Sequence, residues 1–444
     1  MFDEHSSLGV SGMKISVIGC GYLGAVHSAA MVELGHDVVG IDVDAAKIAL
    51  LEAGSPPFFE PGLPEILTSA KDTGRLRFST DIGEAAEATV HFIAVGTPQQ
   101  KDGNAADLTY VDAAITALIP HLKPGDLVVG KSTVPVGTAA RLANRLAESG
   151  TGAALAWNPE FLREGYAVKD TISPDRLVYG VADSSAVAVL DRVYSQAIQA
   201  GTPRLVTDYA TSELVKVSAN AFLATKISFI NAMSEIAEAT DANISDLADA
   251  IGYDNRIGRR FLNAGVGFGG GCLPKDIRAF VARAEELGRG ESVGFLKEVD
   301  AINVRQRQRL VDLAVAALGG SVFEKKITVL GVTFKPHSDD VRDSPALDIA
   351  VQLKGQGADV VATDPQGIDN ARLRHPQLVY ERDVNVALTD ADLVILVTEW
   401  DEFKTLDPRA VRELTRGNLI IDGRNALNPS VWRDAQWVYK SMGR

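Results

Sequence analysis

The sequence lacks most of what a disulfide-bonded, membrane-spanning or secreted protein requires. Only Cys20 and Cys272 occur among 444 residues, which excludes a disulfide framework and fits a reducing cytoplasm. No apolar run approaches the ~18 residues of a membrane-spanning helix, and the N-terminus has no basic segment followed by an apolar one. No Cys/His cluster has the spacing of metal ligands, so we expect no metal site.

Basic residues are also scarce relative to acidic ones. The chain has 44 Lys and Arg against 58 Asp and Glu, which gives a net charge of −14. An acidic surface repels phosphate backbones, so nucleic acid is not an expected partner. Any anionic ligand therefore needs a local site of Lys, Arg and main-chain N–H groups.

Strand-like and helix-like segments alternate at both ends of the chain. Nearly continuous Val, Ile and Leu in the strand-like runs is typical of parallel strands covered on both faces. The predicted strands are Lys14–Gly19, Asp37–Asp42, Thr89–Val95, Asp126–Lys131, Ala154–Trp157, Lys326–Gly331, Ala358–Asp364, Ala391–Thr398 and Asn418–Asp422. The fold class is therefore α/β, with two Rossmann-like doubly wound domains.

A long helical segment separates these two α/β regions. Residues 209–241 contain no Pro or Gly, which predicts a single helix, and a helix this long usually bridges domains or packs against a second subunit. Helical patterns continue to about Leu318. The predicted domains are thus 13–207, 208–318 and 319–444, with the middle one helical.

The first glycine-rich motif has the context of a dinucleotide-binding turn. A GxGxxG pattern follows a predicted strand and opens a helix, and Asp42 ends the next strand 18 residues after Gly24. An acid there binds ribose hydroxyls and repels a 2′-phosphate, which predicts NAD rather than NADP. The alternative is a structural turn without a ligand. The cofactor-binding candidates in this motif are Gly19, Gly21, Tyr22, Leu23 and Gly24.

A second glycine-rich segment precedes the other cysteine. Residues 265–271 contain five glycines, and Cys272, Pro274 and Lys275 follow. Pro274 suits the first turn of a helix, which places Cys272 just outside a helix N-terminus beside Lys275, where the thiolate is favoured. A thiolate can attack an aldehyde and form a thiohemiacetal, which becomes a thioester on loss of hydride. The alternative is an inert, buried cysteine beside a flexible loop.

Other polar groups gather at strand ends or on one helix face. The segments 95–98, 131–138 and 158–165 follow predicted strands, and Lys216 and Asn220 are spaced to share one face of the long helix. Parallel sheets bind ligands at the carboxyl ends of their strands. Helix caps, turns and a solvated helix face are the structural alternatives.

Together these motifs resemble the UDP-glucose/GDP-mannose dehydrogenase family. The resemblance runs from about Met13 to about Arg424, in ordered motifs. They are GCGYLG (19–24), FFEPGL (58–63), VGTP (95–98), KSTVPVGT (131–138), NPEFLREG (158–165), ELVKVSANAFLATKISFIN (213–231), RIGRRFLNAGVGFGGGCLPKD (256–276) and GVTFKPHSDDVRDSP (331–345). The resemblance implies two Rossmann-like domains, the first binding NAD and the second a UDP-sugar, joined by a long helix at the core of a homodimer.

The implied reaction oxidises the C6 alcohol of a nucleotide sugar to a carboxylate with two NAD+ and one water. By resemblance, Cys272 is the nucleophile, and Lys216 and Asn220 stabilise the oxyanion at C6. Asp276 would hold Lys216 and water, and Glu160 would act as a general base on water positioned by Thr133.

The resemblance also implies ligand contacts. Those with NAD are Asp42, Lys47, Thr97, Thr133, Glu164, Lys275 and Arg342. Those with the sugar nucleotide are Glu160, Phe161, Leu162, Arg163, Glu164, Lys216, Asn220, Arg256, Phe261, Leu262, Asn263, Ala264, Gly265, Gly269 and Lys335, with Arg424 as a further candidate. The arginine that matches Arg256 reaches into the site of the neighbouring subunit in the family.

The match through 256–276 favours UDP-glucose as the substrate. The nearest alternative is a sister dehydrogenase acting on GDP-mannose or a UDP-N-acetylhexosamine. A non-catalytic regulator that binds nucleotide sugars is the alternative from another class. It predicts loss of Cys272, Lys216 or Asp276, and all three are present.

Overall fold

The first part of the structure is built on one eight-stranded sheet. The computed structural model describes residues 12–444, which divide into a unit ending at Ser218 and a unit beginning at Ala219. In sheet order the strands are β3 (Leu76–Ser79), β2 (Asp37–Ile41), β1 (Lys14–Ile18), β4 (Val90–Ile93), β5 (Leu127–Gly130), β6 (Ala154–Trp157), β7 (Leu177–Val181) and β8 (Arg204–Thr207). The first six are parallel in the doubly wound order predicted, and β7 runs antiparallel to β6.

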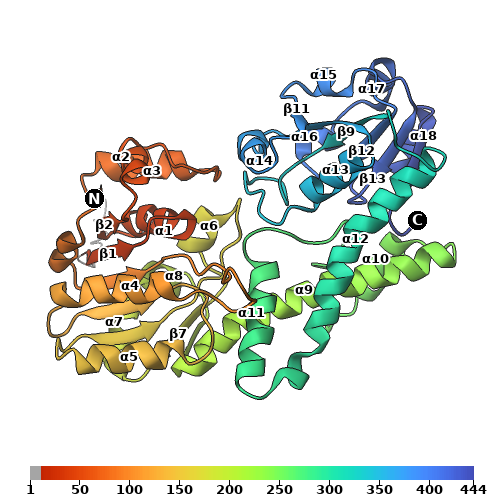
Figure 1. The fold of residues 1–444 in the computed structure, drawn as a ribbon. Helices are drawn as coiled ribbons and strands as arrows, with labels where there is room; N and C mark the ends of the chain where they lie inside the picture. Colours follow the sequence, from red (N-terminus) through yellow and green to blue (C-terminus); the bar gives the residue numbers. More distant parts are fainter. Residues whose placement is uncertain (1–11) are drawn as a thin grey trace, which may run out of the picture. The chain divides into compact units, whose positions relative to one another are not determined.

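Helices cover both faces of this sheet (Figure 1). Alternate strand residues enter separate cores: Val17 packs with α1 and α3, whereas its neighbour Ile18 packs with α4 and α5. This explains why the strands are apolar throughout. The helices are α1 (Tyr22–Glu33), α2 (Ala45–Glu52), α3 (Leu63–Asp72), α4 (Thr109–Leu118), α5 (Thr138–Glu148), α6 (Ala167–Ile172), α7 (Ser184–Val193) and α8 (Ser195–Gln199), with 3₁₀ turns at Ile82–Glu87 and Ile119–His121.

The predicted long helix is confirmed as α9 (Tyr209–Ala239). It begins in the first unit and continues through the second. Asp241 has a φ of 55°, a left-handed conformation in which a helix does not continue. The other helices before the second sheet are α10 (Ile244–Gly252), α11 (Leu273–Glu286), a 3₁₀ turn at Gly290–Val293, and α12 (Phe295–Ala317).

The second unit contains a six-stranded parallel sheet with the same strand order as the first six strands. Its order is β11 (Val379–Tyr380), β10 (Asp359–Thr363), β9 (Lys326–Leu330), β12 (Leu393–Leu396), β13 (Leu419–Asp422) and β14 (Val438–Ser441). Its helices are α13 (Pro345–Gly355), α14 (Ile368–Arg374), α15 (Val384–Leu388), α16 (Asp401–Lys404), α17 (Pro408–Leu414) and α18 (Pro429–Asp434). Both predicted doubly wound sheets are therefore confirmed.

All nine predicted strands are present, and five further strands were not predicted. Those five are β3, β7, β8, β11 and β14. β3 and β14 alternate exposed and buried residues, so they lack the continuous apolar run used as the criterion, and β11 has only two residues. β8 is an edge strand with little burial. The predicted three-part division of the chain stays a prediction.

None of the helices formed by residues 12–444 combines the length and apolar character needed to cross a membrane.

Candidate active site

The turn after β1 is shaped to receive a phosphate-bearing ligand. Gly19 has a φ of 93°, and a Cβ on Gly24 would lie 1.8 Å from the Gly19 carbonyl oxygen. These two glycines allow the tight turn and the close contact between strand and helix. Gly21, just before α1, has open space where a Cβ would point. A ligand can therefore approach the main chain at the positive end of the helix dipole.

Asp42 lies at the end of β2 and binds the same turn. Its Oδ2 accepts hydrogen bonds from Cys20 N (2.8 Å) and from Lys47 Nζ (2.9 Å), and its Oδ1 accepts one from Asp44 N (3.0 Å). Burial opposes ionisation, but the bonds from Asp44 and Lys47 outweigh it and lower the pKa of Asp42. A carboxylate fixed here, together with the open Gly21, fits the ribose and pyrophosphate of a dinucleotide.

Glu60 joins three of the sequence motifs, a role the sequence did not reveal. Its carboxylate accepts hydrogen bonds from the main-chain N–H groups of Gly165 (2.6 Å) and Ala167 (2.7 Å) and from the Tyr22 hydroxyl. Burial is the largest influence on this group and raises the pKa of Glu60, although these donors favour its charged form. The FFEPGL segment therefore ties the glycine-rich turn to the segment that contains Glu164.

Two further loops leave the carboxyl ends of β5 and β6. Thr97 is buried, and its hydroxyl donates to the carbonyl of Thr133 (2.8 Å), which connects the loops after β4 and β5. Across β5 and β6, Lys131 Nζ donates to Asn158 Oδ1 (3.0 Å). The polar residues predicted at these strand ends therefore lie together.

Glu160 and Lys216 form a largely buried ion pair. Lys216 Nζ lies 2.9 Å from Glu160 Oε1, and their side chains are 7% and 13% exposed. Glu160 Oε2 accepts from the N–H of Leu162 (2.8 Å), and the Lys216 ammonium lies 5.7 Å from the centre of the Phe161 ring. Both oxygens of Glu160 are thus fixed. Arg163, from the same segment, forms an ion pair with Asp170 (2.7 Å).

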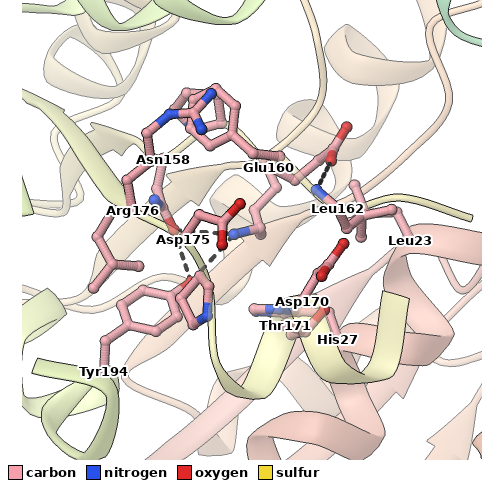
Figure 2. Close-up of a pocket in the computed structure, with 15 residues that line it drawn as sticks. Leu23, His27, Asn158, Glu160, Leu162, Asp170, Thr171, Asp175, Arg176 and Tyr194 are labelled. Carbon is pink, nitrogen blue, oxygen red and sulfur yellow. Dashed lines mark hydrogen bonds between the residues drawn. The ribbon is translucent and has the colours of Figure 1, made fainter. Parts of the chain in front are cut away.

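Glu160 is one of the residues that line a small pocket of about 40 Å³. Figure 2 shows Asn158, Arg176 and Tyr194 along one wall and Leu23 and Leu162 along the other. His27 also lines this pocket, and neither of its buried ring nitrogens has a hydrogen-bond partner within residues 12–444.

In the second unit, Cys272 caps the N-terminus of α11. It is exposed, Pro274 follows within the first turn, and Asp276 N donates to the Cys272 carbonyl (3.0 Å). The predicted position at the start of a helix is confirmed, so the alternative of a buried cysteine is wrong. Cys20 is the buried cysteine, and burial raises the pKa of its thiol.

Asp276 is buried between two donors. Its Oδ2 accepts from Asn220 Nδ2 (2.7 Å), and Lys275 Nζ lies 2.5 Å from its Oδ1. Lys216, the predicted partner of Asp276, forms its described ion pair with Glu160, and its contact with Asp276 stays a prediction. The polar groups thus form two sets, with α9 supplying Lys216 to the first and Asn220 to the second.

The glycine-rich loop before Cys272 is held against the rest of its unit. Asn303 on α12 accepts from Phe268 N (2.7 Å) and donates to Phe268 O (2.9 Å), and a Cβ on Gly267 would lie 2.4 Å from its side-chain oxygen. A Cβ on Gly269 would lie 2.2 Å from the carbonyl oxygen of Asp343. The loop is therefore packed, and its glycines serve close approach. Asn303 was not predicted from the sequence. The signal that could have identified it is a polar residue on the apolar face of a helix.

The segment before this loop carries further predicted sugar-nucleotide contacts. Phe261 is 38% exposed with a φ of 66°, an unusual conformation for a bulky residue and one found at binding sites. Asn263 Oδ1 accepts from Arg259 (2.7 Å), and Gly265 N donates to Asn231 (2.9 Å). Leu262 and Ala264 of the same segment are buried.

Three of the basic residues predicted to bind ligands lie on loops and differ in their surroundings. The Arg256 side chain is 89% exposed and pairs with Asp254 of its own turn. Arg342 pairs with Asp340 (2.7 Å), and the Lys335 ammonium lies 5.3 Å from the centre of the Phe334 ring.

Arg424 is bound to the main chain. It donates to the carbonyls of Val397 (2.6 Å), Gly267 (2.8 Å) and Phe334 (3.1 Å). These contacts favour a role in positioning the loops, and its contact with substrate stays a prediction. Among residues 12–444, no three His, Cys, Asp or Glu side chains group closely enough to hold a metal ion.

Family comparisons cover nearly the whole chain. Residues 13–198 match the NAD binding domain of the UDP-glucose/GDP-mannose dehydrogenase family, 210–305 match its central domain, and 328–429 match its UDP binding domain. A UDP-glucose 6-dehydrogenase from Rhizobium meliloti is 41% identical over 97% of this chain and 100% of its own length. UDP-glucose 6-dehydrogenase TuaD from Bacillus subtilis is 41% identical over 97% of this chain and 93% of its own.

Solved structures of the same family have a similar fold over nearly the whole chain. A UDP-glucose dehydrogenase from Pyrobaculum islandicum superposes with a TM-score of 0.90 at 38% identity, covering 98% of this chain and 99% of that one. A UDP-D-ManNAc dehydrogenase from Pyrococcus horikoshii gives a TM-score of 0.85 at 25% identity, covering 97% and 99%. The chain therefore belongs to the UDP-glucose/GDP-mannose dehydrogenase family.

Proposed function

We propose that this protein oxidises UDP-glucose to UDP-glucuronate in two steps, consuming two NAD+ and one water. The observation that carries the proposal is the exposed Cys272 at the N-terminus of α11, beside a packed glycine loop. A helix N-terminus favours a thiolate, and a thiolate can hold an aldehyde for a second oxidation. A reducing cytoplasm suits this chemistry, because Cys272 has to remain a free thiol.

NAD+ supplies the hydride acceptor when it is bound. The main-chain N–H groups of the Gly19–Gly24 turn would bind the pyrophosphate, and Asp42, paired with Lys47, would bind the ribose. The other NAD contacts in the proposal are Thr97, Thr133, Glu164, Lys275 and Arg342. The open space at Gly21 and the hydrogen bond from Cys20 N to Asp42 support this placement.

The chemistry is assigned to the two polar sets. Lys216 and Asn220 would stabilise negative charge on the C6 oxygen, since a buried ammonium and an amide N–H are effective there. Cys272 would form the thiohemiacetal, which becomes a thioester when hydride leaves. Glu160 would take the proton from the attacking water, with Thr133 and Asp276 placing that water. The fixed carboxylates of Glu160 and Asp276 support these roles.

The sugar nucleotide would be bound by segment 160–164, by segment 261–265 with Gly269, and by Lys335 and Arg424. Arg256 would reach the site of a second copy of the chain, and its high exposure supports such a role. We also propose the functional division into an NAD-binding domain (13–207), a central dimerisation domain (208–318) and a UDP-sugar-binding domain (319–444).

The substrate can be tested directly with purified protein. UDP-glucose, GDP-mannose and UDP-N-acetylmannosamine are compared as substrates by following NADH. We expect UDP-glucose to give the highest kcat/KM. A clear preference for either of the others would establish a sister activity, and no turnover with any of them would support a non-catalytic regulator.

We expect NAD+ to be preferred over NADP+ by at least about tenfold in kcat/KM, because the Asp42 carboxylate repels a 2′-phosphate. Its lowered pKa keeps it charged throughout the neutral range. Asp42→Asn keeps the shape and removes the charge, so the preference should narrow. Equal efficiency of the two cofactors in the unmodified enzyme would contradict the role of Asp42.

The proposed dimer is supported by an apolar stripe on α9. Phe222, Phe229 and Ile236 are 67%, 49% and 59% exposed, and their spacing of seven residues places them along one side of the helix. Large apolar side chains in a row on an exposed helix mark an interaction surface. Because a two-fold axis brings the same surface of two copies together, a second α9 is the proposed partner.

Phe229→Asp should convert the dimer to a monomer, since it places a charge in the centre of the stripe. Activity should fall as the dimer is lost if Arg256 completes the partner's site. Sedimentation velocity combined with an activity assay measures both. Phe323→Asp, at an exposed phenylalanine outside α9, is the control; Phe323 is 62% exposed against 49% for Phe229. A fully active monomer of the unmodified protein would refute this part of the proposal.

A further inference from the structure

Lys131 is a buried cation at the junction of two functional loops. The residue is 7% exposed, and it directly follows β5, opposite Asn158, which directly follows β6. Asn158 N donates to Gly130 O (2.8 Å), which continues the pairing of the two strands. From these two residues the chain runs on to Thr133 and to Glu160.

The surroundings of the Lys131 ammonium are polar but contain no direct counter-ion. It donates to Asn158 Oδ1 (3.0 Å) and to the Tyr194 hydroxyl (3.2 Å), which itself donates to the same Asn158 oxygen (2.7 Å). The rings of Phe92 and Tyr194 lie 5.8 Å and 5.6 Å away. No salt bridge reaches Lys131 from anywhere in residues 12–444, although Glu160 attracts its charge and Lys216 repels it.

This arrangement reduces the stability of the fold. Burial lowers the pKa of Lys131 from 10.5 to about 8, and Lys216 adds to the lowering while Glu160 opposes it. The unfolded chain then binds this proton more tightly than the folded one, so the charge destabilises the fold below about pH 8. This destabilisation of the fold disappears as the pH rises from about 8 towards 10.5, the usual pKa of a lysine. An apolar side chain would fill this position at lower cost, which indicates a function.

We propose that Lys131 is a positioning residue for the hydrolytic half of the reaction, cross-linking the loops that carry Thr133 and Glu160. The proposal rests on the function proposed above. Asn158 is followed by the rigid Pro159 and then by Glu160, so fixing the Asn158 amide fixes the approach of Glu160 to water. Asn158 Nδ2 donates to Val178 O (3.0 Å), which anchors the amide on a third strand. Lys131 touches none of the reacting atoms in this account.

The charged and titratable groups facing Lys131 come from every neighbouring element. Glu160 and Lys216 belong to the ion pair described above, and Tyr194 binds the ammonium directly. His27 on α1 is buried, and its pKa is held well below the ordinary value by burial and then by the Lys131 charge. Asp170, Asp175 and Arg176 line the same pocket.

The test compares Lys131→Met with the unmodified enzyme by rapid mixing with UDP-glucose and NAD+. The rate of the first NADH burst should stay within about threefold of that of the unmodified enzyme. The steady-state rate should fall about 100-fold, which is the scale for a misplaced catalytic group. After acid quench, intact mass should show a UDP-glucuronyl group on Cys272 in most of the variant. Lys123→Met, at the other end of β5 and exposed, should behave as the unmodified enzyme.

Lys131→Gln keeps a donor for Asn158 without the charge and should be intermediate; it carries the test if Lys131→Met does not fold. Tyr194→Phe retains the ammonium and should accumulate little adduct. The proposal is overturned if burst and steady-state rates fall together, or if neither changes. If the unmodified enzyme makes no UDP-glucuronate, the proposed function itself fails, a result distinct from these two.

Discussion

Cys272→Ser is expected to reduce turnover of UDP-glucose to UDP-glucuronate by at least about a thousandfold, or roughly 4 kcal/mol of transition-state stabilisation. Serine keeps the approximate shape, but its hydroxyl is essentially undissociated at neutral pH and is a far weaker nucleophile. The first oxidation needs no thiol and should be partly retained. An ester formed slowly at residue 272 would hydrolyse less readily than a thioester and accumulate.

Two measurements check this expectation: steady-state NADH formation, and intact mass after incubation with UDP-glucose and NAD+. Cys20→Ala is the control, because the Cys20 thiol is buried within the cofactor turn and has no proposed chemical role, and the substitution keeps the main-chain N–H that binds Asp42. It should retain most of the activity. Near-normal formation of UDP-glucuronate by the serine variant would show that Cys272 is a packing residue.

Lys216→Met is expected to lower kcat by about 10²- to 10³-fold, the range seen when one oxyanion donor is removed. The Lys216 side chain is 7% exposed and its ammonium lies 2.9 Å from Glu160, so water cannot readily replace it. The loss should appear in kcat more than in KM, because the charge it stabilises develops during the reaction. Affinity for NAD+ should be nearly unchanged.

Steady-state kinetics and NAD+ titration measure these two effects separately. Lys297→Met is the control, because Lys297 is 61% exposed and pairs with Glu285 on the surface. That variant should match the unmodified enzyme. A rise in KM with unchanged kcat for Lys216→Met would assign Lys216 to substrate binding alone.

The sequence was sufficient where the physical signal is local. Gly19, Gly24 and Asp42 are defined by the conformation and spacing of one turn and two strands, and Pro274 marks the helix that Cys272 caps. The nine predicted strands followed from nearly continuous apolar runs. The two glycines and the cysteine depend on their own turn or helix, and Asp42 is found at a fixed spacing after the turn that it binds.

The sequence was insufficient where contacts join distant segments. Glu60 binds Gly165 from 105 residues away, and Lys131 meets Asn158 across 27 residues. Each lay inside a recognised motif, but nothing local shows which partner it binds. Asp276 was expected to hold Lys216, and that contact stays a prediction; the donors described on Asp276 are Asn220 and Lys275, neither of which was predicted as its partner. The choice among donors depends on packing that composition and spacing do not encode.

Two successive oxidations at one thiol site are the central feature of the proposed reaction. The direct test supplies a limiting, known amount of UDP-glucose with excess NAD+ and counts the NADH formed at completion while identifying the product. We expect two NADH per UDP-glucose with UDP-glucuronate as the product. One NADH per UDP-glucose, with the free aldehyde released, would contradict it.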